Sequence, residues 1–445
     1  MIGYARASDL SVTADGARLS LATADALTPA GPVVRPSFFS GFVTRPDAMA
    51  AALLAVADVA ATSYYDLSAR RASLDPVVTA SGDRLRFEAF SRCNGVYARF
   101  DLLSDGINAG EVGYGTTNVD INPPLRQALA STQLADLLHL DVGEDGLAVA
   151  TPAQTHLERP VDLPDRWIRG FAEVPAIAAR MRLVDEVDRL PTMTFLASLP
   201  SGAPGPTVHY APGPRGLQPS AVRRESDVRL AGTSRLSAAR RVMRFAQRMR
   251  AYAHASGASG WVLDIPGGRI TFLITAEPYR GFSGEGGLLH ALGDVDDDAL
   301  SAVAACLAWQ PVIDTDAIAR EASLTRDRVD GALAVFAVSG RVGFDLVDGA
   351  WFHRELPLDP SRVGGDHARL ERARELVASE QAVLTEGMCR VVVDGAVHWV
   401  RVSGGALHCT CQWHARYGHS RGPCAHELAA RILLARPGKG NRNDH

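Results

Sequence analysis

The amino-acid sequence predicts a multidomain α+β protein, and three features of the chain lead to that prediction. Segments with the spacing of amphipathic helices are interspersed with short runs that alternate apolar and polar side chains, as strands do. At 445 residues, the chain is longer than a single hydrophobic core usually accommodates. Proline, glycine and serine cluster over residues 198–220 too densely for regular structure, apart from a short strand-containing loop near Val208 and Tyr210.

Residues 1–200 form the first predicted unit, an N-terminal α+β domain. An alanine-rich apolar run predicts a buried helix over residues 46–61, and Pro164 and Asp165 are start signals for a second amphipathic helix. Strand-like runs lie at 84–90, 96–103 and 115–122, and another helix opens at Pro123.

A Pro/Gly linker at 201–220 separates this domain from a small predicted βαββ domain at 221–295. Its elements are a strand at 227–232, an arginine-rich helix at 237–249, and strands at 261–265 and 269–275. Pro266, Gly267 and Gly268 form the turn between the last two strands.

Residues 296–357 predict three helices followed by a β-hairpin, which is the order of a winged helix. The third helix of a winged helix can enter the major groove of DNA. Here that helix begins with alternating arginines and aspartates over 325–330, and the hairpin also mixes Arg341 and Arg354 with Asp345, Asp348 and Glu355. Because such a surface offers few phosphate contacts, we expect it to pack against protein rather than DNA.

A linker helix at 358–387 leads to residues 388–436, whose spacing indicates a specific chemistry. Cys409 and Cys411 form a C-x-C pair, and Cys424 and His426 form a C-x-H pair after twelve intervening residues. Three thiolates and an imidazole can close a tetrahedral Zn²⁺ site with no position left for water, which indicates one structural zinc ion. Short strands before the first pair and a helix after Pro423 predict a ββα zinc finger; the tail at 437–445 is expected to be disordered.

The choice of ligands has alternatives within the same segment. His408, His414 and His419 are competing donors, and His419 is the main rival of His426. The remaining cysteines lie in largely apolar surroundings and are interpreted as small core residues: Cys93, Cys306 and Cys389.

Two basic regions are candidate surfaces for nucleic acid or an acidic partner. Between Arg215 and Arg250 there are ten arginines and two acids, and five of the arginines point mostly away from the apolar face of the predicted helix: Arg240, Arg241, Arg244, Arg248 and Arg250. The zinc finger adds Arg416, Arg421 and Arg431. The alternative is a solvated arginine surface in a chain with a single lysine, Lys439.

No set of residues in the sequence indicates catalysis. The glycine-rich run at 281–287 lacks the last glycine of a nucleophile elbow, and the run at 112–118 lacks the lysine of a P-loop. Four carboxylates on strand-like runs are interpreted as side chains on exposed strand faces: Glu88, Asp101, Glu111 and Asp120. We therefore expect a protein that is not an enzyme.

The expected location of the protein and its net charge further limit the classes of function that we consider. Thiols arranged for a metal rather than for disulfides favour a reducing cytoplasm. The N-terminus lacks the pattern of a signal peptide, and no run approaches the ~20 apolar residues that span a bilayer. The net charge of −4 gives the whole chain no electrostatic reason to bind nucleic acid.

The C-x-C and C-x-H pairs resemble those of SWIM zinc fingers, and all four ligand positions match. With the runs at 115–122, 158–174 and 279–287, the chain is similar to a bacterial family of SWIM zinc finger proteins. The resemblance implies DNA binding or protein–protein contact. It further implies an adaptor or substrate-recognition role beside a MoxR-type AAA+ ATPase and a von Willebrand factor A protein.

Two hypotheses from different classes follow. The first is a cytoplasmic, zinc-containing adaptor that docks a protein partner through its C-terminal units. The second is a DNA-binding protein that contacts phosphate through the finger and the 215–250 segment, and it predicts affinity that falls steeply with salt.

Overall fold

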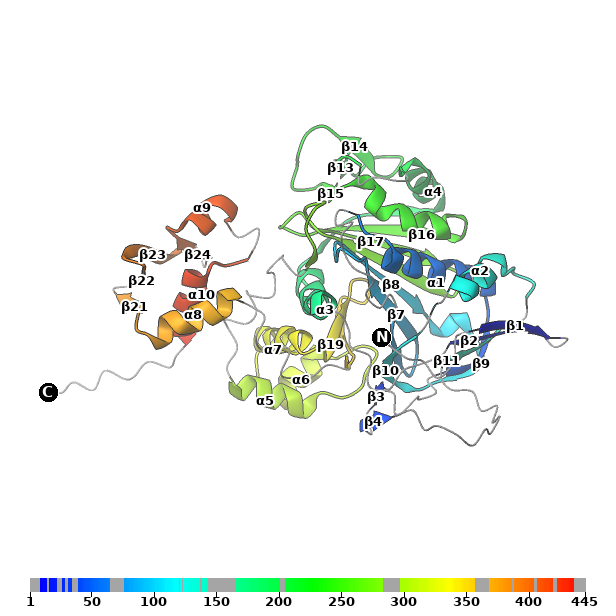
Figure 1. Cartoon of the computed structure of the whole chain (residues 1–445), viewed down its shortest axis with the longest axis horizontal. Coiled ribbons are helices and arrows are strands. Elements are labelled where there is room, and N and C mark those ends of the chain that lie inside the picture. Colours follow the sequence, from blue (N-terminus) through cyan, green and yellow to red (C-terminus); the bar gives the residue numbers. More distant parts are fainter. Residues whose placement is uncertain are drawn as a thin grey trace.

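The structure is a computed structural model of the whole chain (Figure 1), and it confirms a mixed α+β architecture with several sheets. The described residues are 9–13, 16–21, 26–28, 31–33, 39–64, 76–119, 121, 123–136, 138–142, 165–200, 205–282, 297–356, 368–385, 388–403, 406–418 and 422–435. Among them, no helix is both long enough and apolar enough to cross a membrane.

A ten-stranded antiparallel sheet organises the larger part of the chain. Strands β8 and β18 pair along their whole length, from Val96 with Ile274 to Leu102 with Gly268, so segments on both sides of 201–220 share this sheet. The order of its strands is β12 (Arg182–Asp188), β16 (Arg248–Ala253), β17 (Ser259–Ile265), β18 (Gly268–Ile274), β8 (Val96–Leu102), β7 (Leu85–Phe90), β6 (Val77–Ser81), β10 (Tyr114–Asn118), β3 (Ala26–Thr28) and β4 (Gly31–Val33).

The apolar face of this sheet is covered by α1 (Pro46–Ala61), the buried helix that the sequence predicts. Proline in the first turn fits the start of a helix, where backbone N–H groups have no partner within the helix. The many alanines of α1 let it lie against β7 and β8, where Phe87 and Phe100 stack with ring centroids 5.9 Å apart. On its other side α1 packs against the 3-10 helix η2 (Thr233–Phe245).

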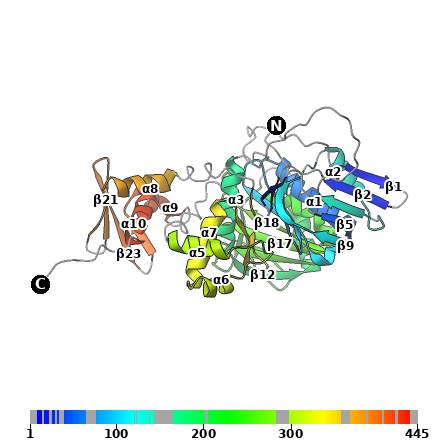
Figure 2. The same cartoon turned by 90° about the horizontal axis from the view of Figure 1, so that it is seen from below.

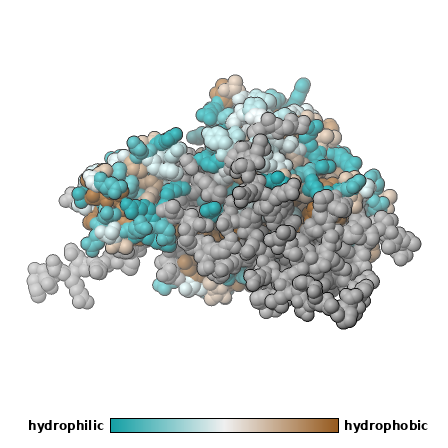
Figure 3. Space-filling view, in the orientation of Figure 1, coloured by the Kyte–Doolittle hydropathy of each residue, from teal (hydrophilic) through white to brown (hydrophobic). Residues whose placement is uncertain are grey.

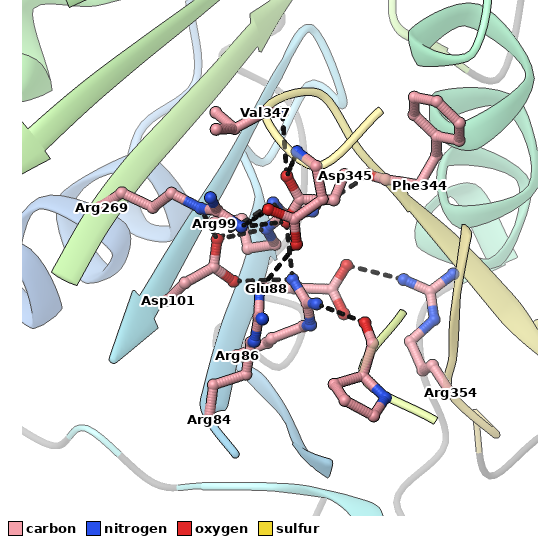
Figure 4. A network of polar contacts seen from close by, with 12 residues as sticks. Arg84, Arg86, Glu88, Arg99, Asp101, Arg269, Phe344, Asp345, Val347 and Arg354 are labelled. Carbon is pink, nitrogen blue, oxygen red and sulfur yellow. Dashed lines mark hydrogen bonds and ion pairs between the residues drawn. The ribbon is translucent and has the colours of Figure 1, made fainter. Parts of the chain in front are cut away.

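The opposite face of the sheet carries charged side chains, yet they are buried. Arg86 on β7 pairs in register with Asp101 on β8, and Asp101 pairs in register with Arg269 on β18. Because paired residues share a face of the sheet, these side chains point the same way. The hairpin of β19 (Val342–Asp345) and β20 (Ala350–His353) lies over them and contributes Asp345 to the cluster (Figure 4).

Asp345 is the centre of this buried charge network. Its Oδ2 accepts hydrogen bonds from Arg99 at 2.6 Å, Arg269 at 2.7 Å and Arg86 at 2.8 Å, and the Asp345 side chain is 1% exposed. Burial alone would raise the pKa of Asp345, but Arg99, Arg86 and Arg269 outweigh burial and hold that pKa well below its usual range. A depressed native pKa stabilises the fold above about pH 4, and this stabilisation is lost as the pH falls further.

A second buried ion pair joins the same hairpin to the sheet. Arg354, just after β20, donates to Glu88 on β7 at 2.6 Å, and Tyr97 on β8 donates to the same Glu88 oxygen at 2.7 Å. Arg354 also lies over the ring of Phe171 in α3 (Asp165–Ala178), 4.7 Å from the centroid. Helix, hairpin and sheet are thus held together by charges that solvent does not reach.

These contacts correct two interpretations made from the sequence. Glu88 and Asp101 do not lie on an exposed strand face, since both are buried and paired with arginine. Arg354 and Asp345 are not part of an exposed mixed-charge surface, because both are buried inside the chain. The side chains of Glu111 and Asp120 lie outside the described residues.

The three helices before the hairpin follow the predicted order and have their own apolar core. Asp314 and Thr325 cap the second and third helices, each accepting a backbone N–H through its side chain. The third helix packs against α3, so it is covered by the rest of the chain on one side. The bounds are α5 (Asp297–Cys306), α6 (Thr315–Glu321) and α7 (Arg326–Val338).

Three short helices follow strands of the large sheet along the chain. The 3-10 helix η1 (Ser104–Gly106) follows β8, α2 (Pro123–Ser131) follows β10, and α4 (Arg189–Ser198) follows β12.

Two smaller sheets flank the large one. One small sheet has the order β1 (Asp9–Thr13), β2 (Gly16–Leu21), β11 (Leu138–Val142), β5 (Phe39–Val43) and β9 (Ile107–Val112). The other has the order β14 (Gln218–Ser220), β13 (Val208–Ala211) and β15 (Val228–Leu230), so the predicted strand near Val208 is confirmed.

The arginine-rich helix predicted over 237–249 is wrong in type and extent. The segment up to Phe245 is the 3-10 helix η2, and residues from Arg248 to Ala253 form strand β16. Met249 and Tyr252 are buried in this strand. Pairing of β16 with β12 and β17 on its two sides outweighs the helical spacing of the apolar residues.

The C-terminal module is a separate body in Figures 1 and 2, with its own hydrophobic core. Helix α8 lies in the segment expected to be a linker, but it packs against α10 and buries Leu370, Ala373 and Leu376. The helix also ends earlier than expected, and β21 follows it. The elements are α8 (Ala368–Ala378), β21 (Ala382–Thr385), β22 (Met388–Val393), β23 (Ala396–Ser403), β24 (Ala406–Cys409), α9 (Gln412–Tyr417) and α10 (Ala425–Ala435).

Replacing Asp345→Asn tests the network. The amide removes the negative charge that Arg86, Arg99 and Arg269 share, and an unpaired buried charge costs about 3–5 kcal/mol. We expect a loss of that size in the free energy of unfolding, measured by urea denaturation with the fluorescence of the buried Trp167 and Trp261.

Asp105→Asn is the matched control, because Asp105 is exposed and its carboxylate makes no hydrogen bond or ion pair among the described residues. This control should change the free energy by less than about 0.5 kcal/mol. Equal effects of the two substitutions would contradict a central role for Asp345.

Candidate metal centre

The four predicted zinc ligands are presented by the ends of three elements. Cys409 ends β24, Cys411 is the N-cap of α9, Cys424 immediately precedes α10, and His426 lies in the first turn of α10. The Sγ of Cys411 accepts the backbone N–H of His414, and the Sγ of Cys424 accepts that of Glu427 at 3.3 Å. Helix N-termini therefore direct N–H groups at two of the sulfurs, which favours thiolates.

The ligand atoms are close enough to share one ion. All four lie within 4.8 Å of one another, and the Sγ of Cys409 is 3.5 Å from Nδ1 of His426. Tetrahedral coordination with ordinary zinc–sulfur and zinc–nitrogen bond lengths would place a sulfur and a nitrogen about 3.6 Å apart. The three cysteines are buried and His426 is half-buried, so the cluster can hold one metal ion largely shielded from water.

The crowding of three thiols affects their acidity. A hydrogen bond with Cys411 raises the pKa of Cys409 to about 12, and hydrogen bonds with Cys409 and Cys411 raise the pKa of Cys424 as well. Hydrogen bonds from Cys409 and Cys424 hold the pKa of Cys411 below its usual range. A divalent cation bound by the three sulfurs would favour their thiolate forms.

A buried carboxylate next to the ligands holds the backbone of one of them. Glu427 is 0% exposed, its Oε2 accepts the backbone N–H of Cys424 at 2.9 Å, and its Oε1 lies 2.7 Å from Nδ1 of His414. The ring of His398 stacks on that of His426 with centroids 4.4 Å apart, which fixes the orientation of the imidazole. No pattern in the chain singles out Glu427, although this residue directly follows His426.

This geometry shows which of the competing histidines belong to the cluster. His414 lies beside Glu427, and His408 packs edge-on against His414 with ring centroids 5.5 Å apart, so neither belongs to the four-ligand cluster. His419 lies outside the described residues, as does Arg421. Soft thiolate donors with one imidazole favour a thiophilic divalent cation.

The arginines predicted to form a binding surface do not form one continuous face. Arg240, Arg241, Arg244 and Arg248 are all exposed, but Arg248 lies on β16 while the other three lie on η2. Several are already engaged: Arg241 pairs with Asp58 at 2.7 Å, Arg248 with Glu186 at 3.2 Å, and Arg240 donates to the carbonyl of Leu199. Arg416 is exposed on α9 and Arg431 is half-buried on α10.

Comparisons with known proteins do not assign a family. No family model matches this chain, and no curated protein matches it. Among solved structures, Proliferating Cellular Nuclear Antigen from Entamoeba histolytica is similar over 54% of this chain and 99% of that one, with 9% identity and a TM-score of 0.32. A similarity at that level carries no argument about fold or function.

Elemental analysis of protein purified without added metal should find one metal ion per chain. Cys424→Ser should lose this ion and unfold the C-terminal module, because the ion ties β24 to α10, and structural metal binding contributes on the order of 10 kcal/mol in isolated finger peptides. Cys306→Ser is the control that should keep the ion, because Cys306 lies at the end of α5 and not in the cluster. Loss of the ion from His419→Ala but not from His426→Ala would refute the ligand assignment.

Glu427→Gln tests the supporting shell without removing a ligand. The amide keeps the shape but loses the charge beside His414 and weakens the bond to the Cys424 N–H. We expect affinity for the metal to fall about 10–100-fold in competition with a chelator. Glu375→Gln, exposed on α8, should leave the affinity unchanged; equal affinities for both variants and the natural chain would show that Glu427 does not support the site.

Proposed function

We propose that the chain is a non-enzymatic, zinc-binding interaction protein whose C-terminal module docks a protein partner. The observation that carries the proposal is an apolar face on the module's four-stranded sheet that no described residue covers. Helices α8 and α10 cover the other face of this sheet. The donor set of three cysteines and one histidine supports zinc as the ion and a structural role for it.

The register of the sheet shows which side chains share the uncovered face. Val383 on β21, Arg390 on β22 and Trp399 on β23 are paired neighbours, and Met388 pairs with Arg401 in the next row. Residues of the alternate parity, such as Val391 and Val400, point to the buried core. We name the uncovered set the outer sheet face: Val383, Met388, Arg390, Val397, Trp399 and Arg401.

The outer sheet face has the composition of a protein interface. Trp399 is 38% exposed and Val383 is 47% exposed, although burying such side chains is strongly favourable in water. Figure 3 shows hydrophobic surface among hydrophilic atoms on the left-hand lobe, which is this module. Apolar, aromatic and arginine side chains together are enriched at interfaces, and exposed apolar patches mark them.

The chemistry of this face limits the partner. Arg390 and Arg401 are exposed and flank the apolar residues, so a partner surface with apolar side chains and a rim of carboxylates would be complementary. An AAA+ ATPase or von Willebrand factor A protein, which the SWIM resemblance implies, is our specific candidate. The adaptor role is a proposal that rests on this surface together with that resemblance.

The DNA-binding alternative has less support. The hairpin that a winged helix would place near phosphate is buried against the large sheet through Asp345 and Arg354, and α7 packs on α3. The predicted arginine surface is divided between η2 and β16 and partly engaged in ion pairs. The helical unit with its hairpin is better suited to packing within the chain.

Affinity purification from the native host, followed by mass spectrometry, tests the proposal. The natural chain should retain a defined protein partner, and Trp399→Ser should reduce its recovery at least about tenfold, because central aromatic side chains dominate interface energies. Leu190→Ser is the matched control, since Leu190 is 75% exposed on α4 and should leave recovery unchanged. Both variants should keep one metal ion per chain.

Two results would contradict the proposal. Equal loss of the partner in Trp399→Ser and Leu190→Ser would show that the outer sheet face is not the docking surface. Submicromolar binding of duplex DNA by the purified protein, with affinity falling steeply with salt, would favour the alternative function.

A further inference from the structure

A positively charged cleft lies where α9 of the C-terminal module approaches the large sheet. Its volume is about 1160 Å³, which is slightly above the usual range for small-molecule sites. Figure 2 shows α9 on the side of the module that is nearer the rest of the chain, and Arg416 and Tyr417 at the end of this helix line the cleft. The opposite wall comes from the turn between α3 and β12, the β14–β15 loop, the β16–β17 turn and the segment after β18.

Seven arginines and three carboxylates line this cleft. They come from segments far apart in the sequence, so the fold gathers charge that the sequence distributes. The arginines are Arg180, Arg182, Arg223, Arg224, Arg229, Arg280 and Arg416, and the carboxylates are Glu225, Asp227 and Glu277. The cleft therefore carries excess positive charge in a chain whose net charge is −4.

The carboxylates do not neutralise all of these arginines. Glu277 pairs with Arg229 at 3.3 Å, and the buried Asp227 accepts the backbone N–H of Arg224 at 3.2 Å, so two of the three serve the local fold. Within the described residues, the guanidinium groups of Arg182, Arg224 and Arg416 form no ion pair, and all three side chains are exposed. These three groups remain available to an anion.

Burial and the positive charge of the cleft lower the pKa of two histidines in it. Burial and the nearby Arg180 lower the pKa of His254 to about 4, and burial with Arg223 and Arg229 lowers the pKa of His209. His209 is therefore neutral at pH 7, and its Nε2 accepts a hydrogen bond from Nε of Arg223 at 3.2 Å. A bound anion would stabilise the protonated form of each histidine and so raise its pKa.

The rim of the cleft carries aromatic surface beside the arginines. Tyr279 is 70% exposed, and Tyr417 lies under the guanidinium of Arg416, 5.4 Å from the ring centroid. An exposed tyrosine ring beside a cationic cleft offers a flat surface for a planar ring. Planar guanidinium forks match phosphate oxygens, and several phosphates would satisfy several arginines at once.

We propose that this cleft binds a small oligophosphate, of the class of nucleoside triphosphates, with the phosphates on Arg182, Arg224 and Arg416 and the base near Tyr279. The charge is concentrated in a bounded concavity rather than along a track, which favours a small molecule over a nucleic acid polymer. This binding is independent of the outer sheet face and goes beyond the docking function proposed above. No chemical step is implied.

Calorimetric titration at physiological salt tests the proposal with ATP and with inorganic tripolyphosphate as probes. The intact chain should bind both saturably, and Arg182→Ala combined with Arg224→Ala should weaken binding at least about tenfold, because both substitutions remove charge-assisted hydrogen bonds. Arg374→Ala is the matched control, since Arg374 is exposed on α8 away from the cleft. Unchanged metal content and circular dichroism confirm that each variant is folded.

The two probes separate the parts of the ligand. Tighter binding of ATP than of tripolyphosphate, with Tyr279→Ala removing the difference, supports both the phosphate and the base contacts. Equal binding of the two probes supports the phosphate site and overturns the base contact. The oligophosphate site itself is overturned if neither probe saturates at millimolar concentration, if the double variant binds as well as the control, or if a single-stranded oligonucleotide binds more tightly than both probes.

Discussion

Asp345 lies between three arginine side chains on the polar face of the large sheet. The position of the β19–β20 hairpin on that sheet depends on these ion pairs. The arginines come from β7, β8 and β18, whereas the carboxylate comes from the hairpin that follows α7. Each charge would be costly to bury alone, and each is acceptable only with the others in place. The network therefore fixes where the hairpin lies on the sheet, and α7 with it.

This constraint also explains what the helical unit does. A hairpin extending from three helices would be a candidate for contacting DNA if it were free. Here two of its charged residues are turned inward, where Arg354 reaches Glu88 and Asp345 reaches Arg86. The unit closes the polar face of the sheet, just as α1 closes the apolar face. The docking surface that we propose therefore lies elsewhere in the molecule.

The docking surface that we propose lies on the C-terminal module, and we expect the folding of this module to depend on its metal site. Its core is small, and Cys409, Cys411 and Cys424 are themselves part of it. A module of this size gains much of its stability from a bound ion. With β24 and α10 tied together, one face of the sheet is covered by helices, and the outer sheet face stays open. The end of α9 completes the arginine-lined cleft.

The sequence by itself determined the features that depend on near neighbours. The spacing of Cys409, Cys411, Cys424 and His426 predicted the metal cluster because all four ligands lie within eighteen residues of chain. Buried helix α1 and five strands of the large sheet, β7, β8, β10, β17 and β18, followed from local composition and spacing in the same way.

Only the tertiary structure decided which polar residues are buried and which segments pair. Arg86 and Asp345 are 259 residues apart, and alternation along a strand looks the same whether its polar face meets water or a hairpin. Likewise, the spacing around Met249 fits a helix, but pairing with β12 and β17 makes that segment a strand. Long-range contacts decide which charged side chains are buried and which arginines line the cleft. Both depend on residues that are distant in the sequence but adjacent in the fold.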